Sequence, residues 1–351
     1  MKIAKRVYIV TNLLLIIATC GAYLAPFTSP ADSTIIPSLG LVFPGLVVCN
    51  LVYFLIGLIW QSKLTMASLL VLFLGLPYVQ NTFNFSLPKT ETNQGQTLHI
   101  ATYNTQFSKP LMLPDGNTNK KMANQFDSFL KSINHLDILG VQECGWRTKE
   151  RIEQSMDFPY QYVINEMYTS IYSKHPIVNK GVVDLEQKIK RINRCLWADI
   201  AIGKDTIRFY TAHLAPNRHD GKIPAILDQN KQEQIDYFKM FGIFQHYPPF
   251  ALKRSEEAAL IKAHQAKSPY PCIISGDFND PPQTFMYSTI SKDLKDTFLE
   301  DGTGFGGTHS GPVPGLRIDY ILVDKQFKVM DHQVLDEPYS DHFMVKAALQ
   351  F

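Results

Sequence analysis

The sequence predicts an α/β protein in which two mixed β-sheets are flanked by helices and preceded by a transmembrane helical region. Two observations lead to this class. Residues 1–80 contain three apolar stretches without an internal charge, whereas residues 97–351 alternate short apolar runs with amphipathic stretches. Many short strands with helices between them are typical of a two-sheet sandwich covered by helices. We expect transmembrane helices within 1–80, a polar linker at 81–96 and a folded domain at 97–351.

The three apolar stretches are residues 7–27, 41–61 and 64–80. The first two reach the roughly 20 residues that a helix needs to cross the hydrocarbon core, and the third is marginal. Helices buried in a soluble bundle are the alternative, but such helices normally have a polar stripe. A cleaved signal peptide is a second alternative for the first stretch.

Charge predicts the orientation of this region. Lys2, Lys5 and Arg6 flank the first stretch and Lys63 lies between the second and third, whereas residues 28–40 contain no basic side chain. Basic flanks remain on the cytoplasmic side. Three crossings would therefore place the domain at 97–351 outside the cytoplasm, as part of an integral protein of the plasma membrane. That domain contains about as many acidic as basic residues, which is not typical of a protein that binds duplex DNA.

The pattern within the large domain predicts its elements in order. An amphipathic helix is expected at 121–133, another helix between Glu143 and Met156, and two helices within 229–267, separated at Pro248-Pro249. Alternating or continuous apolar runs predict the strands, at 98–103, 138–142, 162–166, 169–173, 196–202, 207–214, 272–275, 317–323 and 343–349.

Six apolar runs end in residues that bind metals or handle protons. They are Ala101-Thr-Tyr-Asn104, Val141-Gln-Glu143, Thr211-Ala-His213, Ser275-Gly-Asp277-Phe-Asn279, Arg317-Ile-Asp319 and Ser340-Asp341-His342. Strand ends bring such side chains together at one edge of a sheet. Carboxylates and amides suit a hard divalent cation, and histidines suit proton transfer. This set favours metal-assisted hydrolysis of a phosphate ester.

In this order and spacing the six motifs resemble the endonuclease/exonuclease/phosphatase superfamily, the deoxyribonuclease-I-like metal-dependent phosphodiesterases. The resemblance covers about residues 97–351. It implies a four-layer α/β/β/α sandwich with the active site at one edge, which agrees with the sandwich expected from the strand pattern.

The resemblance also implies residue roles. Glu143 would be the main ligand of Mg²⁺ or Mn²⁺, with Asn104 and Asp341 completing the coordination. The catalytic residues would be His213, Asp277, Asn279, Asp319 and His342. Asp277 would deprotonate the attacking water, Asn279 and His213 would hold the phosphate, and Asp319 would orient His342 beside the scissile bond. The other eight histidines are treated as structural or surface residues.

Two positions depart from the pattern of the family. Relatives that cleave nucleic acids commonly have an acidic residue two positions after the first Asn, where this chain has Gln106. This difference argues mildly against a repair nuclease. No carboxylate that would support His213 is evident in the segment Thr169–Pro176.

The resemblance therefore predicts a membrane-anchored, divalent-metal-dependent phosphoesterase that acts outside the cytoplasm. Its substrate, whether a small molecule, a lipid or a nucleic acid, is left open, as is its oligomeric state. Residues 1–80 would contact the lipid bilayer. The alternatives are an extracytoplasmic DNA or RNA endonuclease and an inactive domain that binds phosphorylated ligands or partners.

Overall fold

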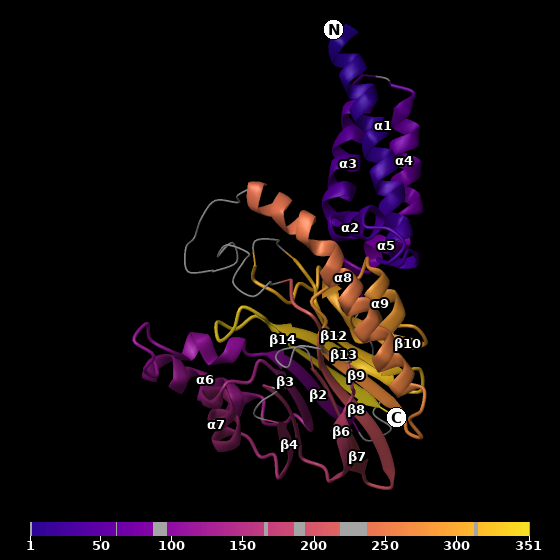
Figure 1. Ribbon diagram of the computed structural model, residues 1–351. Helices are drawn as coiled ribbons and strands as arrows, with labels where there is room; N and C mark the ends of the chain where they lie inside the picture. The colour runs from indigo at the N-terminus through magenta and orange to yellow at the C-terminus, as the bar shows by residue number, and fades with distance from the viewer. Residues whose placement is uncertain are drawn as a thin grey trace.

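The computed structural model describes residues 2–60, 62–86, 97–164, 168–185, 194–217, 237–311 and 315–350. Its two parts are a bundle of helices at the N-terminus and a sandwich of two β-sheets covered by helices (Figure 1). This arrangement confirms the predicted fold class.

The bundle consists of α1 (Lys2–Leu24), the 3₁₀ turn η1 (Ala25–Phe27), α2 (Ile35–Leu41), α3 (Phe43–Ile59), α4 (Leu64–Leu74) and α5 (Leu76–Gln80). The helices α1, α3 and α4 pack side by side, and α2 and α5 lie at the end nearest the sandwich (Figure 1). The N-terminus and the α3–α4 link lie at the opposite end.

Within the described residues one continuous apolar helix, Ile3–Phe27, is long enough to cross a bilayer. The helices α2 and α3 would form a second span only together, and they meet at an angle of 75°. Pro44 is the second residue of α3, and a proline suits the first helical turn better than a helix interior. The third predicted stretch is divided between α4 and α5 at Gly75. Three full crossings thus remain a prediction.

Polar side chains lie inside the bundle and apolar ones lie outside it. Asn12, Asn50 and Ser68 are fully buried, and Ser68 donates to Asn12 at 3.1 Å while Asn50 donates to Thr19 at 2.7 Å. Large apolar side chains cover the exterior, among them Val10, Leu14, Ile17, Val48, Leu51, Leu55, Met66, Leu70 and Phe73. This distribution is the reverse of that in a soluble bundle.

Each sheet of the sandwich has six strands. The first has the order β10-β12-β9-β8-β7-β6, with bounds Leu294–Asp296, Asp319–Asp324, Cys272–Asp277, Asp205–His213, Arg194–Ile202 and Ile177–Val182. The second has the order β13-β14-β2-β3-β5-β4, with bounds Lys328–Leu335, Met344–Gln350, Thr97–Asn104, Ile138–Gln142, Thr169–Ser173 and Tyr160–Ile164. The pairs β2–β3 and β8–β9 are parallel, and all other neighbours are antiparallel.

Helices cover both outer faces (Figure 1). The helices α6 (Lys120–Ser132) and α7 (Trp146–Ser155) lie on one side, and α8 (Tyr237–Gln265) and α9 (Phe285–Ile290) lie on the other, with the short α10 (Thr297–Asp301) beside β13. Side chains such as Ile100, Phe209 and Ile321 fill the space between the sheets. The layers are therefore α/β/β/α, as the resemblance implied.

One expected break is absent. The sequence predicts two helices separated at Pro248-Pro249, but α8 continues through both prolines, so this prediction was wrong. Residues 229–236 lie outside the described part of the chain. Buried contacts hold the helix around the prolines, because the Tyr247 hydroxyl and Arg254 both bind Asp280.

The strands β6, β10 and β13 were not predicted. Of these, β6 and β13 are sheet edges without a clean apolar alternation.

The bundle is docked on the sandwich. The side chain of Gln283 donates to the carbonyl of Tyr78, and that of Arg317 donates to the carbonyl of Asn81 at 2.8 Å. The strand β1 (Asn84–Phe85) pairs with β11 (Thr303–Gly304). The segment Asn81–Ser86, predicted as the start of a linker, is thus bound to the sandwich.

Candidate active site

The predicted site residues lie where strands of both sheets end. Asn104 is the last residue of β2, and Glu143 follows β3 directly. In the other sheet His213 ends β8, in register with Asp277 at the end of β9. The neighbouring strand β12 begins opposite Asp277 with Asp319. Because the parallel strands end at one edge, these side chains converge there.

Contacts across the two sheets close this cluster. The Asn104 side chain donates to Oδ2 of Asp277 at 2.8 Å. Nε2 of His213 lies 3.7 Å from Glu143 Oε1 and 3.6 Å from Asp277 Oδ2. The carboxylates that face His213 are therefore those of Glu143 and Asp277, which sequence reasoning could not identify. One ligand atom from each of Asp277, Asp319 and His342 lies within 4.8 Å of the others.

The ring of His342 lies against the carboxylate of Asp319. Its Nδ1 lies 3.0 Å from Oδ2 and 3.3 Å from Oδ1 of Asp319. Asp319 is itself supported by Thr308, whose hydroxyl oxygen accepts the backbone N–H groups of Ile318 and Asp319. With Nδ1–H donated to a carboxylate, Nε2 of His342 is directed into the site, 3.8 Å from Asp277.

The buried carboxylates change the pKa of two groups. Burial alone would lower the pKa of His342, but Asp319, Asp277 and Asp341 together outweigh burial and raise the pKa above its usual value. Burial raises the pKa of Glu143, opposed by His213 and reinforced by Asp277. The protonated, cationic form of His342 is thus favoured. The ionised form of Glu143 is disfavoured unless a positive charge lies close to it.

Asn279 lies beside the Asp277 carboxylate in a tight turn. Its backbone has a φ of +55°, its N–H donates to Asp277 Oδ1 at 2.9 Å, and its side-chain amide donates to the carbonyl of Leu214 at 3.0 Å. Both oxygens of Asp277 are consequently bonded, one to Asn279 and one to Asn104, which fixes the plane of the carboxylate.

Gln106 has a role that sequence reasoning missed. Its side chain donates to Asp341 Oδ2 at 2.7 Å, and Ser340 donates its hydroxyl to the carbonyl of Asn104 at 2.7 Å. The first loop and the last motif are thereby joined. The position of Gln106, two residues after Asn104, was the available signal, but it was interpreted only as the loss of an acidic residue.

His309 is a second residue that the sequence did not single out. Its backbone forms an isolated antiparallel β-bridge with that of His342. The centroids of the two rings lie 4.7 Å apart, edge to face. Nearby, the N–H of Ser310 donates to the carbonyl of Asp341 at 2.9 Å. The loop at 305–311 therefore forms one wall of the site.

The donor set fits a hard divalent cation. Four carboxylates meet at one edge, those of Glu143, Asp277, Asp319 and Asp341. Within the described residues, the first three of these form ion pairs with histidines. Asp277 and Asp319 are fully buried, and a cation bound beside them would offset their negative charge. Asn104, Glu143 and Asp341 supply the oxygen ligands that Mg²⁺ and Mn²⁺ prefer. Their assignment as ligands remains a prediction.

Gly276, the residue before Asp277, is the tightest point of this edge. It has a φ of +137°, and an added Cβ would overlap the backbone carbonyl oxygen of Ala212 in β8.

We expect Gly276→Ala to lower the free energy of unfolding by more than about 3 kcal/mol, measured by urea denaturation. Gly116→Ala is a matched control, because Gly116 also has a positive φ but nothing within 4 Å of the added Cβ. It should cost about 1 kcal/mol; equal losses would contradict the steric explanation.

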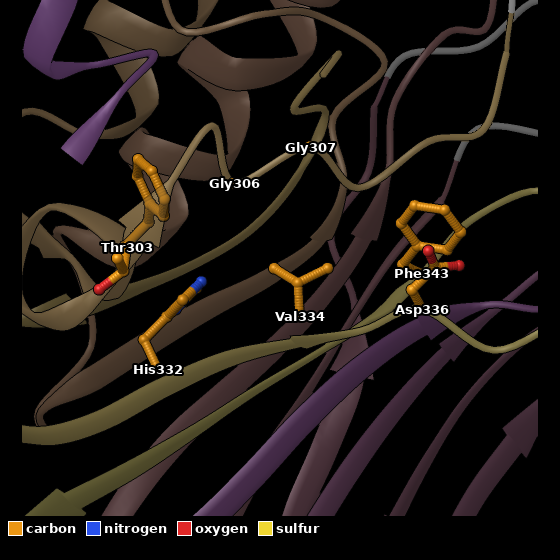
Figure 2. A pocket seen from close by; sticks show the side chains of 8 residues that line it. Thr303, Gly306, Gly307, His332, Val334, Asp336 and Phe343 are labelled. Carbon is orange, nitrogen blue, oxygen red and sulfur yellow. The ribbon is translucent and has the colours of Figure 1, made fainter. Parts of the chain in front are cut away.

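A cavity of about 260 Å³ lies close to this edge but is not the site (Figure 2). It is bounded by β13 and the loop after β11, and its lining includes His332, Val334, Gly306 and Phe343. None of the eight predicted site residues lines it.

Comparison with known families is consistent with this geometry. Residues 101–342 match the model of the Endonuclease/Exonuclease/phosphatase family. Residues 5–82 match a domain of unknown function (DUF8431). None of the curated proteins matches the sequence.

Solved structures show the same fold. A family protein from Bacteroides vulgatus is 18% identical with a TM-score of 0.55, and the match covers 73% of this chain and 99% of that chain. A family protein from Bacteroides thetaiotaomicron is 20% identical with a TM-score of 0.51, covering 74% and 96%. A mannosyl-6-phosphatase from the same species is 19% identical with a TM-score of 0.50, covering 72% and 100%.

Proposed function

The chain belongs to the endonuclease/exonuclease/phosphatase family, whose model spans most of the sandwich, and from this premise we propose a specific function. The protein is a divalent-metal-dependent phosphoesterase, anchored in a membrane by its helical bundle, with the sandwich outside the cytoplasm. The observation that carries the proposal is the cluster of Glu143, Asp277 and His342 at one edge, contributed by both sheets.

The residues of the cluster suit an in-line hydrolysis. Asp277, fixed by Asn104 and Asn279, accepts the proton of the attacking water. His342 and His213, whose Nε2 atoms both lie near Oδ2 of Asp277, hold phosphate oxygens as negative charge develops. Water adds across the P–O bond, so that its oxygen remains on phosphorus and a proton reaches the leaving oxygen. The Nδ1 contact with Asp319 keeps His342 oriented for this role.

A divalent cation held by Asn104, Glu143 and Asp341 would neutralise charge on the phosphate and position it for attack. The contact between Gln106 and Asp341 supports the ligand set, because it fixes the direction of one carboxylate. All eight family positions converge at this edge, which favours an active enzyme over a binding domain without activity.

The bundle supports a location in a membrane. Its buried Asn and Ser side chains bond to one another while its aliphatic side chains face outward, an arrangement suited to hydrocarbon surroundings. In water the exposed aliphatic surface would be a large unfavourable patch. The first helix also has the length and hydropathy of a span.

Aromatic side chains gather at both ends of the bundle. Tyr8 packs against Tyr53 and Trp60, with ring centroids 5.5 and 5.4 Å apart. Tyr23 stacks on Tyr78 at 4.9 Å near the sandwich. Residues 8 and 23 of one helix are about 22 Å apart along its axis, so the two aromatic groups lie toward opposite ends of the bundle, as aromatic side chains do at the two membrane interfaces. The basic residues Lys5, Arg6 and Lys63 belong to the end away from the sandwich, which favours a sandwich outside the cytoplasm.

An activity assay on the full-length protein in detergent or nanodiscs tests the enzymatic proposal. With Mg²⁺ or Mn²⁺ we expect hydrolysis of p-nitrophenyl phosphate or its bis ester, and loss of the activity with EDTA that is reversed by added metal. Plasmid DNA as a parallel substrate tests the nuclease alternative. Activity that persists unchanged in EDTA would overturn the metal-dependent mechanism.

Protease treatment of spheroplasts tests the orientation. We expect added protease to digest the sandwich without lysis, because the bundle would place it outside the cytoplasm. Protection of the sandwich until the membrane is broken would refute this placement.

A further inference from the structure

The bundle is attached directly to the loops that carry the active site. Gln283, which binds the carbonyl of Tyr78, is six residues beyond Asp277, and Arg317, which binds the carbonyl of Asn81, is two residues before Asp319. Gly40 of α2 lies against the carbonyl of Gln283 so closely that a Cβ would overlap it. The end of the bundle therefore contacts the segments that carry the catalytic edge directly.

An exposed aromatic surface lies between the bundle and the site. Phe85 is 72% exposed, Phe305 is 63% exposed and Phe83, in ring contact with Phe305 at 5.1 Å, is 39% exposed. These three residues form the Phe83–Phe85–Phe305 surface. Phe83 and Phe85 follow α5 in the chain, and Phe305 follows β11, the strand that pairs with β1. Exposed aromatic rings at this level suit the interface of a bilayer.

The same loop connects this surface with the catalytic centre. Phe305 and His309 are four positions apart in the chain, at most about 14 Å of extended backbone, and the ring of His309 lies 4.7 Å from that of His342. The site is consequently held within reach of a bilayer surface. A soluble phosphate ester would gain nothing from this attachment, whereas an ester embedded in the same bilayer would be presented at high effective concentration.

We propose that the substrate is a membrane lipid that carries a phosphate ester, and that the Phe83–Phe85–Phe305 surface lies on the bilayer beside the active site. The headgroup phosphate enters the site along the loop at 305–311 while the apolar chains remain in the membrane. This inference rests on the proposed phosphoesterase function and on the membrane location of the bundle.

The test uses the full-length protein in phosphatidylcholine nanodiscs that contain phosphatidic acid or phosphatidylglycerol. Glycerol 3-phosphate and glycerophosphoglycerol are the water-soluble counterparts of these lipids. The nitrophenyl esters measure the phosphoesterase activity that does not depend on a lipid. We expect at least one lipid to be hydrolysed with a kcat/KM about tenfold or more above that of its soluble counterpart. The measured quantity for each variant is this ratio of lipid to soluble activity.

Gly40→Val separates the bundle from Gln283 and is expected to lower the ratio about tenfold. Gly45→Val is the matched control, since nothing lies within 4 Å of a Cβ at Gly45, and it should leave the ratio unchanged. If Gly40→Val does not fold, Phe85→Ser combined with Phe305→Ser provides the second test, with the same expected fall in the ratio. Tyr160→Ser is its control, because Tyr160 is 40% exposed at the start of β4, at the end of the sheet away from the site.

The possible outcomes are distinct. Hydrolysis of lipids with an unchanged ratio in both test variants would overturn the role of the docked bundle and the aromatic surface. Hydrolysis of soluble esters without any hydrolysis of the lipids would overturn the lipid substrate and leave the phosphoesterase proposal standing. Failure to hydrolyse any phosphate ester with Mg²⁺ or Mn²⁺ would instead refute the proposed function itself.

Discussion

His342→Ala should lower kcat for phosphate-ester hydrolysis by about a thousandfold, the effect expected when a proton-transfer or charge-stabilising group is removed. The imidazole is buried, bonded through Nδ1 to Asp319 and directed with Nε2 toward Asp277. No water molecule can reproduce both the position and the raised pKa of this group. Steady-state kinetics with a nitrophenyl ester measures the loss.

A matched histidine provides the control. His175 also lies beside a carboxylate, with Nε2 3.3 Å from Asp137, but Asp137 precedes β3 and is thus at the end of the sheet opposite Glu143. His175→Ala should leave kcat within about twofold of the original value. A similar fall for both variants would indicate a general loss of structure. Unchanged kcat for His342→Ala would exclude this edge as the catalytic site.

Glu143→Gln should abolish metal binding and lower kcat by more than about a thousandfold, because it removes the carboxylate expected to be the main ligand. The same change should not destabilise the metal-free protein. Burial raises the pKa of Glu143, so the ionised carboxylate is disfavoured in the folded state. At neutral pH the charge of Glu143 therefore opposes folding, and the neutral amide of Gln relieves this effect.

Thermal unfolding with and without Mn²⁺ measures both effects. The original protein should gain stability with Mn²⁺ as the ion binds only the folded state, whereas Glu143→Gln should show no shift in Tm and an equal or higher Tm without metal. Glu150→Gln on α7 is the control, since Glu150 bonds to Gln154 on an exposed helix surface. A full Mn²⁺ shift in Glu143→Gln would contradict the assignment of Glu143 as a ligand.

The sequence was sufficient for elements that carry a strong local pattern. The strands at 138–142 and 169–173 were predicted with the bounds that β3 and β5 have. The first contains the continuous apolar run Ile138–Val141 that is typical of a buried strand, whereas the second is fully buried although three of its side chains are Thr or Ser. Edge strands were harder to recognise. β13 contains Lys328, Asp331 and His332, and its pairing with β14 on one side only leaves it without a distinctive apolar alternation.

The prediction of two helices at 229–267 failed for a related reason. Local sequence treats two adjacent prolines as a break, since each removes a helical hydrogen bond. Contacts from distant residues outweighed this local preference, as Asp280 binds both Tyr247 and Arg254 across the helix. Such contacts are decided by the packing of the whole chain and leave no mark within the segment itself.

By itself, the sequence determined the fold class and the apolar region at the N-terminus, and it predicted eight residues of an active site, because local apolar patterns and motif chemistry depend on neighbouring residues. Only the tertiary structure decided that Gln106 orients Asp341, that Glu143 and Asp277 face His213, and that the bundle rests on Gln283 and Arg317. These contacts join residues far apart in the chain. Their geometry depends on how two sheets and a bundle pack against one another, which the order of residues along one segment does not reveal.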